Sequence, residues 1–230
     1  MEIKMKYRFA QGIFIALGGA ILFSTKAIWV KLAYREAPVD ALTLLALRMI
    51  FSLPFFIAAA FVSSSQNTNV KFTKREWVGI ALIGCLGYYI SSLLDFAGLK
   101  YVSAGIERLI LFAYPTFALL MSAFLFKQEV KPIQWLALTI TYLGLIAAFL
   151  GEVDFGSAQN SNFIFGSILI FICAITYAGY MVGSGRIIPK VGASKFNSYA
   201  MSFAGAGVLV HFSIHRNGSL VGQPTIIYLY

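Results

Sequence analysis

The sequence predicts an all-α, polytopic membrane helical bundle, and three observations lead to this fold class. First, 59% of the 230 residues are apolar and only 12% are charged, whereas a soluble domain carries about 25% charged residues. Second, the apolar residues gather in seven runs, each long enough to cross about 30 Å of hydrocarbon as a helix. Third, Lys and Arg concentrate in every second connection between these runs, as is typical of membrane proteins.

The seven predicted spans contain five of the 27 charged side chains, of which 18 are basic and 9 acidic. The spans cover residues 9–30, 41–62, 77–98, 104–126, 133–150, 163–183 and 196–214. The first follows a short basic segment, but it is too long for the apolar core of a signal peptide and no cleavage pattern of small residues follows it. We therefore expect it to remain as a membrane anchor.

The later spans carry signals of the membrane interface and of helix packing. Trp77 and Trp135 open the third and fifth spans, where interfacial aromatic residues are expected. A G-x-x-x-G pattern at 179–183 and an AGAG run at 204–207 place small residues on the sixth and seventh spans. Small residues let helix backbones approach closely, so these two spans are predicted to pack against neighbours.

The basic residues orient the chain with its N-terminus in the cytoplasm. This orientation places 11 Lys and Arg residues inside and four outside, and the opposite one would invert the bias. The inside residues are Lys4, Lys6, Arg8, Lys71, Lys74, Arg75, Lys127, Lys131, Arg186, Lys190 and Lys195, and the outside ones are Lys31, Arg35, Lys100 and Arg216. We expect a multi-pass protein of the cell (inner or plasma) membrane, whose net charge of +9 marks a membrane face and not a nucleic-acid site.

The chain also resembles itself at an offset of 154 residues, which aligns the first span with the sixth and the second with the seventh. The aligned segments enter the membrane from opposite sides, as inverted repeats do in many secondary transporters. We expect a five-helix repeat at 9–151 and an incomplete, inverted second repeat at 163–230 with two helices. By the same offset the partner of the third span would begin at residue 231, so we expect the second repeat to be cut short by three helices.

Two stretches resemble a known family. The segment AGIERLILFAYPTFALLMSAFLFKQEVKPIQWLALTITYLGLIAAF at 104–149 includes Tyr114, Pro115, Glu129, Gln134 and Gly144. It resembles the closing helix pair of an EamA-type domain, and GGAILFSTKAIWVKLAYREAPVDALTLLALRMIFSLPFF at 18–56 resembles the opening pair. The chain is thus similar to the drug/metabolite transporter superfamily, whose members are usually ten-helix proteins made of two inverted five-helix domains.

This resemblance implies an integral membrane permease that exports or imports a small metabolite or drug by alternating access. No P-loop is present, so the expected transport is secondary and not driven by ATP. The expected partners are a small-molecule substrate, a coupled proton or other ion, and the lipid bilayer; the sequence is compatible with a homo-oligomer. The alternative is a truncated, non-transporting membrane protein that retains a folded five-helix domain and needs a partner.

Five charged residues within the spans are the first candidates for a functional site, because each costs about 2.5–3.5 kcal/mol near the bilayer centre. Counted along the helices, all five fall in the outward half of the membrane: Lys26, Arg48, Asp95, Glu107 and Arg108. We expect them to line or brace a substrate pocket, with Asp95 or Glu107 as a proton carrier. The alternative is that Lys26 and Arg108 extend to the headgroups and that Glu107 only pairs with Arg108.

Aromatic residues with a polar group form a second candidate set, which comprises Trp29, Tyr88, Tyr89, Tyr114, Tyr142, Tyr177 and Tyr180. Tyr88 and Tyr114 lie near the centres of their spans, where a hydroxyl needs a polar partner or a wet cavity. They are therefore the candidates for substrate contacts, including cation–π contacts with a cationic ligand. The alternative is ordinary packing.

The remaining motifs predict neither an enzyme nor a cofactor. His211 and His215 are spaced i, i+4 but have no acidic or Cys partner, so no metal site is predicted. Cys85 and Cys173 lie inside apolar runs and give no disulfide framework. The seventh span lacks a Lys for a Schiff base, and the inside N-terminus is opposite to that of a receptor, which argues against both seven-helix classes.

Overall fold

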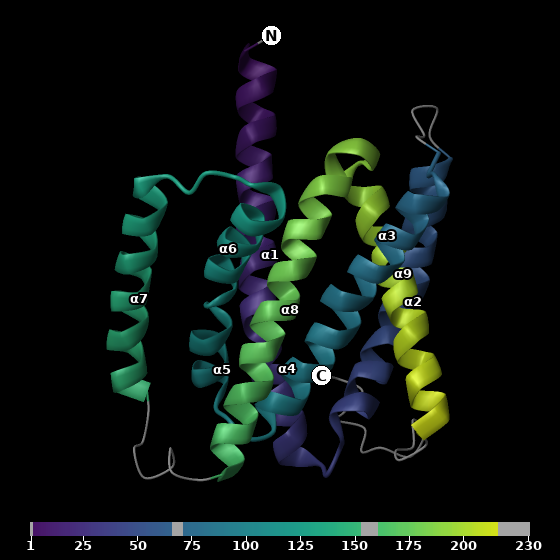
Figure 1. Cartoon of the computed structure of the whole chain (residues 1–230). Coiled ribbons are helices and arrows are strands. Elements are labelled where there is room, and N and C mark those ends of the chain that lie inside the picture. Colours follow the sequence, from purple (N-terminus) through teal and green to yellow (C-terminus); the bar gives the residue numbers. More distant parts are fainter. Residues whose placement is uncertain (1, 66–70, 153–160, 216–230) are drawn as a thin grey trace.

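The protein is described by a computed structural model over residues 2–65, 71–152 and 161–215, and these ranges consist of helices and short connections (Figure 1). The helices are α1 (Glu2–Glu36), α2 (Ala41–Ser64), α3 (Lys74–Gly84), the π-helix η1 (Cys85–Ile90), α4 (Ser91–Leu99), α5 (Ala104–Leu111), α6 (Tyr114–Phe126), α7 (Pro132–Glu152), α8 (Ser161–Val191) and α9 (Ala193–His215). No strand occurs in the described ranges. The predicted all-α fold class is confirmed.

Six stretches are long and apolar enough to cross a membrane. They are Gln11–Glu36, Ala41–Ser64, Lys74–Leu99, Ala104–Phe126, Pro132–Gly151 and Asn162–Val191. The predicted seventh span lies within α9, which forms a 23-residue helix but is more polar, with Lys195, Asn197 and several serines in its first three turns. The first six predicted spans thus overlap these six stretches, and the seventh is a helix of different composition.

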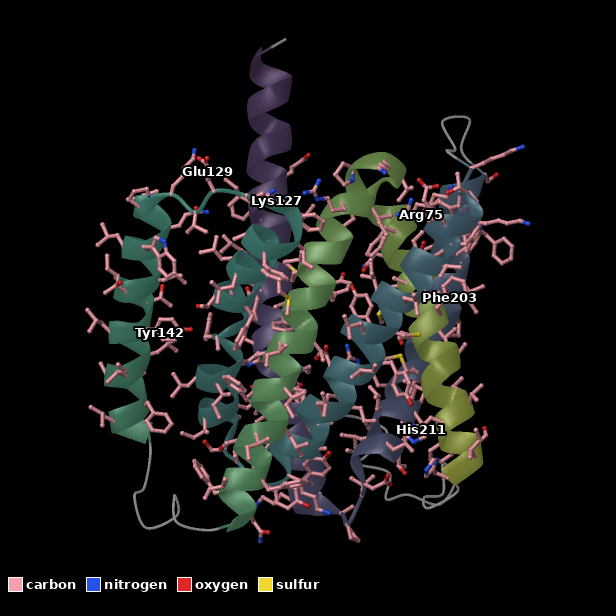
Figure 2. The ribbon with its side chains drawn as sticks, viewed as in Figure 1. Arg75, Lys127, Glu129, Tyr142, Phe203 and His211 are labelled. Atoms are coloured by element: carbon pink, nitrogen blue, oxygen red, sulfur yellow. The ribbon has the colours of Figure 1, made fainter. Side chains whose placement is uncertain are left out.

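The bundle has two ends. The α1–α2 and α4–α5 connections lie at the end drawn lowest in Figure 1, which we call the lower end, and the α6–α7 and α8–α9 connections lie at the upper end. Figure 2 shows Arg75, Lys127 and Glu129 near the upper end and His211 toward the lower end. Of the residues used to orient the chain, Arg216 and the side chains of Lys4, Lys6 and Arg8 lie outside what the structure describes.

Local caps fix where several helices begin. The Asp40 side chain accepts a hydrogen bond from the Thr43 amide and caps α2. Thr73 and Glu76 form a capping box at α3, in which each side chain accepts from the other's backbone amide. Between α8 and α9, Gly192 has φ +87°, a left-handed conformation that glycine adopts at little cost, and it makes the sharp turn between these helices.

Helix α8 lies centrally and contacts α3, η1, α4, α5, α6 and α9. Helix α9 packs along α2 and against α3 and η1. Two glycines explain how closely these backbones approach: a Cβ atom at Gly84 would lie 2.6 Å from the Ala200 carbonyl oxygen, and one at Gly87 would lie 2.3 Å from Cγ of Tyr180. The close contacts predicted for the small residues of the sixth and seventh spans also occur, since a Cβ at Gly183 would lie 2.8 Å from Cδ1 of Ile83 and one at Gly205 would lie 2.6 Å from Cδ1 of Leu53.

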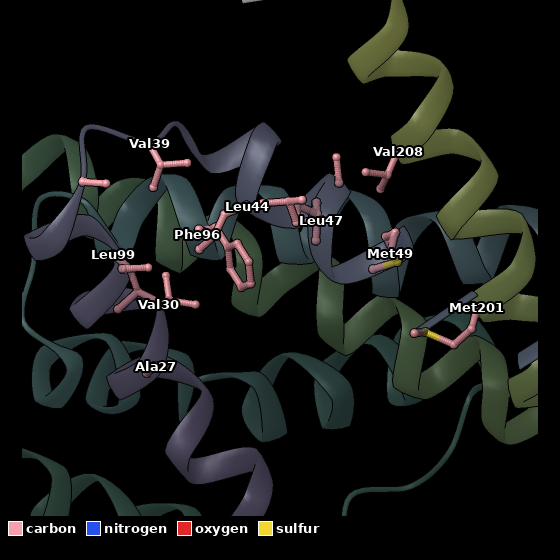
Figure 3. Packing of buried hydrophobic residues seen from close by; sticks show 14 residues of the cluster. Ala27, Val30, Val39, Leu44, Leu47, Met49, Phe96, Leu99, Met201 and Val208 are labelled. Atoms are coloured by element: carbon pink, nitrogen blue, oxygen red, sulfur yellow. The ribbon is translucent and has the colours of Figure 1, made fainter. Parts of the chain in front are cut away.

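Buried apolar residues from α1, α2, α4 and α9 form the largest core cluster, part of which is labelled in Figure 3. Phe96 and Leu99 of α4 lie in this cluster with Val30 of α1 and Leu47 of α2. Two polar contacts also fix α1 to α4, because Lys31 donates to the Leu99 carbonyl and Tyr34 to the Phe96 carbonyl, at 2.7 and 2.8 Å. This packing holds α1, α2 and α4 in one arrangement.

Three predicted spans differ from the observed helices. The fourth, 104–126, is divided into α5 and α6, because Pro115 at the start of α6 has no amide to continue the helical ladder. The third, 77–98, contains the π-helix η1 between α3 and α4. The sixth continues past residue 183 to Val191, since nothing before Gly192 ends the helix.

Candidate functional site

A cavity of about 240 Å³ lies among α1, α2, η1, α4, α5 and α8. Its lining residues are Phe23, Lys26, Arg48, Gly87, Tyr88, Ser91, Ser92, Asp95, Leu111, Cys173 and Tyr177. Four of the seven predicted site residues are therefore neighbours around one cavity. These four residues come from four different elements, α1, α2, η1 and α4. Only the tertiary packing of these elements brings them together.

Lys26 and Asp95 form an ion pair that joins α1 to α4. The Asp95 side chain is 2% exposed, and Lys26 is partly exposed and lies near the rings of Phe23 and Phe96. A carboxylate so completely removed from water is strongly destabilising unless it is paired, and Lys26 supplies the opposite charge. Lys26 thus pairs with Asp95 in the structure, and its role in substrate binding stays a prediction.

Glu107 and Arg108 lie beside this pair on α5, Glu107 in its first turn and Arg108 in its last. Glu107 is completely buried, and its carboxylate lies 3.2 Å from Nε of Arg108 without a hydrogen bond. Arg108 donates to the Phe23 carbonyl at 2.8 Å and lies over the Phe23 ring. Neither residue lines the cavity; both support its wall next to Phe23.

The carboxyl groups of Asp95 and Glu107 are neighbours that interact with each other. Asp95 Oδ1 and both Glu107 oxygens have no hydrogen-bond donor among the described residues. Two carboxyl groups can form a hydrogen bond only when one of them carries a proton. A proton on this pair would supply one such bond, and one Glu107 oxygen would still lack a donor.

Arg48 reaches the cavity from α2 and differs from the other charges. Its guanidinium lies 5.9 Å from the centre of the Phe96 ring. Its side chain is exposed, and within the described part of the chain it makes neither an ion pair nor a hydrogen bond. The cavity thus contains one cation that forms no ion pair among the described residues, and Asp95 interacts with it only at longer range.

Hydroxyl groups line the rest of the polar wall. Ser91 donates to the Leu86 carbonyl and contacts the Thr176 hydroxyl, both at 2.8 Å. Ser92 and Tyr177 make no hydrogen bond with any other residue that the structure describes. Their two hydroxyls are therefore available to a bound molecule.

The π-helix η1 positions Tyr88 between two cavities. The Tyr88 hydroxyl donates to Oδ1 of Asn197 on α9 and lies 2.7 Å from the Tyr180 hydroxyl on α8. A second cavity, of about 330 Å³, lies on the other side of Asn197, toward the upper end. Its lining residues are Phe56, Ala59, Ile188, Ala193, Ser194, Phe196, Asn197 and Ser198. Tyr88 lines the first cavity, which we call the lower cavity, and its partner Asn197 lines the second, which we call the upper cavity.

Tyr114 lies outside the lower cavity, with its ring packed edge-to-face on Tyr177 at 5.2 Å between centroids. Of the residues that line the cavity, Ser91 and Ser92 were not predicted. They lie four and three residues before Asp95, on the same helix face, so this spacing is a signal that could have found them. Asn197 carries no such signal, because it reaches Tyr88 only through the crossing of α9 and η1.

Comparison with known proteins places this chain in a family. A model of the EamA-like transporter family matches residues 10–150, more than half of the chain. The protein named "Uncharacterized transporter YcbK" of Bacillus subtilis (strain 168) is 30% identical over 220 residues, which are 95% of this chain and 68% of YcbK. "Uncharacterized transporter YdfC" of the same organism is 27% identical over 159 residues, which are 67% of this chain and 50% of YdfC.

Two further similarities are more distant. An "Uncharacterized transporter" of Archaeoglobus fulgidus is 21% identical over 195 residues, 84% of this chain and 64% of that protein. A crystal structure of a protein that is 21% identical aligns with a TM-score of 0.55 and covers 92% of this chain and 73% of that one, which shows a shared fold. The chain thus spans between half and about two-thirds of the length of these relatives.

Proposed function

The chain belongs to the EamA-like transporter family, and on this premise we propose that it moves a small molecule across the membrane by alternating access, without ATP. Its helices and its family make it a membrane transporter; the mechanism, the direction and the substrate are the proposal. We further propose that the lower cavity is the substrate site. The supporting observation is a cavity among membrane-spanning helices that is lined by charged side chains from three of them.

The proposed site residues fall into two groups. Lys26, Arg48, Asp95 and Tyr88 line the cavity and would contact the substrate. Glu107, Arg108 and Tyr114 lie behind the wall and would hold the lining residues in place. Charged groups within a membrane protein are costly, and they commonly mark substrate or ion pathways.

Alternating access requires a barrier that opens on one side at a time. We assign this role to the contact of Tyr88 with Asn197, because Tyr88 lines the lower cavity and Asn197 lines the upper one. Opening this contact would join the lower cavity to the upper one, and closing it would leave the lower cavity facing only the lower end. The orientation expected from the basic residues makes the lower end the outside and the N-terminus cytoplasmic.

Thiol labelling tests alternation without knowledge of the substrate. Single cysteines, Ser92→Cys in the lower cavity and Ser194→Cys in the upper one, are placed in a Cys85→Ala/Cys173→Ala background and labelled in oriented vesicles with a membrane-impermeant maleimide. We expect Ser92→Cys to react from the lower side and Ser194→Cys from the upper side. Adding Asn197→Ala is expected to make Ser92→Cys reactive from the upper side also. Labelling of both cysteines from both sides without Asn197→Ala would contradict a barrier at this contact.

Uptake into proteoliposomes tests transport itself. The purified chain, its Asp95→Asn variant and YcbK as a comparator are reconstituted and supplied with a panel of radiolabelled amino acids, organic anions and amines. We expect uptake of at least one compound by the chain and at least tenfold less of it by Asp95→Asn. Uptake by YcbK without any uptake by this chain would instead favour a membrane protein that requires a partner.

We propose that a proton accompanies the substrate and is held between Asp95 and Glu107. The support is that this pair lacks a hydrogen-bond donor unless one carboxyl is protonated. The other charged or titratable groups that face the pair are Lys26 and Tyr34 of α1, Arg48 of α2, Arg108 of α5 and Cys173 of α8. None of these groups is a third carboxylate, so the proton has no other carboxylate to bind around the pair.

The coupling test separates accumulation from exchange. With a compound that the chain takes up, wild type is expected to accumulate it in response to a pH gradient and also to exchange it at equal pH. Glu107→Gln keeps an amide in place of the carboxyl group, so it is expected to retain exchange and to lose accumulation driven by the gradient. Accumulation by wild type that ignores the pH gradient would exclude this coupling.

A further inference from the structure

We propose that the ligand of the lower cavity is a small organic anion whose negative group binds the guanidinium of Arg48. This inference rests on the proposed function, because it assigns a substrate class to the same cavity. It starts from the charges around the cavity. Asp95 neutralises Lys26, and Glu107 lies against Arg108, which leaves Arg48 without an acidic partner among the described residues.

An unneutralised cation at this depth is unfavourable in the empty site. Placing Arg within a membrane helix is unfavourable, and an anion beside it offsets part of this cost. Arg48 is exposed and lines the cavity, so its guanidinium can be reached by a molecule there. The planar guanidinium presents paired N–H donors that match a carboxylate, which makes Arg a strong binder of this group.

The uncharged groups of the wall favour the same class. The hydroxyls of Ser92 and Tyr177 have no hydrogen-bond partner among the residues that the structure describes, and hydroxyls can donate to an anion. Phe23, Tyr88 and Tyr177 add aromatic surface for an apolar part of the ligand. The volume of about 240 Å³ equals roughly eight water molecules at ~30 Å³ each, so the ligand must be small.

A cationic ligand fits the same wall less well. The acidic group at the cavity is Asp95, which is already paired with Lys26 and lies beside Glu107. A cation that reached Asp95 would have to displace Lys26 and lie near Arg48. Both steps place like charges together in a medium of low dielectric constant, where repulsion is strong. The arrangement therefore disfavours the cationic ligand that the central tyrosines suggested.

Matched probes test the charge of the ligand. Two sets of similar size are used: benzoate, benzamide and benzylamine, and butyrate, butyramide and butylamine. Their affinities for the purified chain in nanodiscs are measured by calorimetry and by the shift in thermal unfolding temperature. We expect the anion of at least one set to bind at least tenfold more tightly than its amide and its amine. If no anion is preferred in either set, the inference is wrong.

Substitutions then locate the preference. Arg48→Gln is expected to weaken anion binding about 10- to 100-fold, as loss of a charge-assisted hydrogen-bonding pair does, and Arg48→Lys is expected to restore part of it. The matched control is Arg186→Gln, since Arg186 lies over the Phe126 ring and does not line the cavity. An anion preference that survives in a folded Arg48→Gln variant would overturn the assignment to this residue.

A second measurement needs no ligand, so it reports the charge of the cavity even if none of the probes binds to Arg48→Gln. In the Cys85→Ala/Cys173→Ala background, Ser92→Cys is treated with sulfonatoethyl or trimethylammonioethyl methanethiosulfonate, which carry opposite charges. The measured quantity is the reaction rate of the anionic reagent divided by that of the cationic one. This ratio is expected to be about tenfold higher with Arg48 present than in Arg48→Gln. Equal ratios in the two proteins would contradict a positive cavity.

The outcomes distinguish this inference from the proposed function. Uptake of an amine or a neutral compound by the chain, without anion binding at Arg48, would retain the transporter and exclude the anion. Anion binding that depends on Arg48, without uptake of any compound, would retain the anion site and exclude transport by this chain.

Discussion

Helices α7 and α9 lie on opposite sides of the bundle and show opposite relations between apolarity and burial (Figure 1). Helix α7 is one of the six stretches apolar enough to cross a membrane, yet no residue between 132 and 151 is buried. Helix α9 is not among these six, yet eight of its residues are buried against its neighbours. Apolarity therefore predicts that a helix enters the bilayer and does not predict how closely it packs.

The reason lies in the residues at the contacts. In lipid the hydrophobic effect does not drive helices together, so close contact depends on small residues and on shape. Helix α9 meets its neighbours at Ala200, Ala204 and Gly205, which are all buried. Helix α7 presents large apolar side chains, including Leu136, Leu143 and Ile146, which are exposed. We therefore expect substitutions at the contacts of α9 to lower the free energy of unfolding more than matched substitutions in α7.

The largest expected effect comes from a side chain added where α9 approaches α3. Gly84→Leu would place its Cβ 2.6 Å from the carbonyl oxygen of Ala200, and a backbone atom cannot move aside as a side chain can. We expect a loss of about 3 kcal/mol or more in the free energy of unfolding, seen as a lower thermal unfolding temperature in detergent. The matched control is Gly144→Leu in α7, where nothing lies within 4 Å. Equal losses in both variants would remove the contrast between the two helices.

Replacing a glycine by alanine is expected to lower the free energy of unfolding in α9 and to raise it in α7. Gly205→Ala would bring its Cβ within 2.6 Å of Cδ1 of Leu53, a movable side-chain end, so we expect a loss of about 1 kcal/mol. Gly144→Ala meets no neighbour and is expected to gain up to about 1 kcal/mol from higher helix propensity. Reversible unfolding in mixed micelles measures both free energies. The comparison fails if Gly205→Ala is also stabilising.

The smallest effects are expected from one hydroxyl on each helix. Tyr142 of α7 is hydrogen-bonded to Thr116, and Tyr199 of α9 to Ser64, both at 2.8 Å. Such bonds between membrane helices contribute about 0.6 kcal/mol on average. We therefore expect Tyr142→Phe and Tyr199→Phe to lower the free energy of unfolding by similar small amounts. A much larger loss for Tyr199→Phe would mean that hydrogen bonding, and not packing, distinguishes α9.

Much of the fold could be predicted from the sequence because the bilayer imposes length and apolarity on each span. The break between α5 and α6 has a signal in the sequence, Pro115, whereas the π-helix at Cys85–Ile90 could not be located, since it leaves the apolar run unchanged. For the site, charges at similar depth indicated which residues could meet, and Lys26 with Asp95 does meet. Depth does not give the direction around the helix axis, so the places of Tyr114 and Asn197 depended on how the helices cross.

The π-helix η1 has a consequence for insertions and deletions. The Ser91 amide donates to the Leu86 carbonyl, five residues back, so this turn contains one residue more than an α-helical turn. Converting this turn to an α-helical one with every residue kept would rotate all that follows by about 100° and turn Ser92 and Asp95 away from the cavity. Removing one residue from Cys85–Ile90 would instead restore an α-helix and leave Ser92 and Asp95 facing the cavity. A one-residue gap at this point in an alignment would therefore mark relatives that have an α-helix here and keep the same cavity lining.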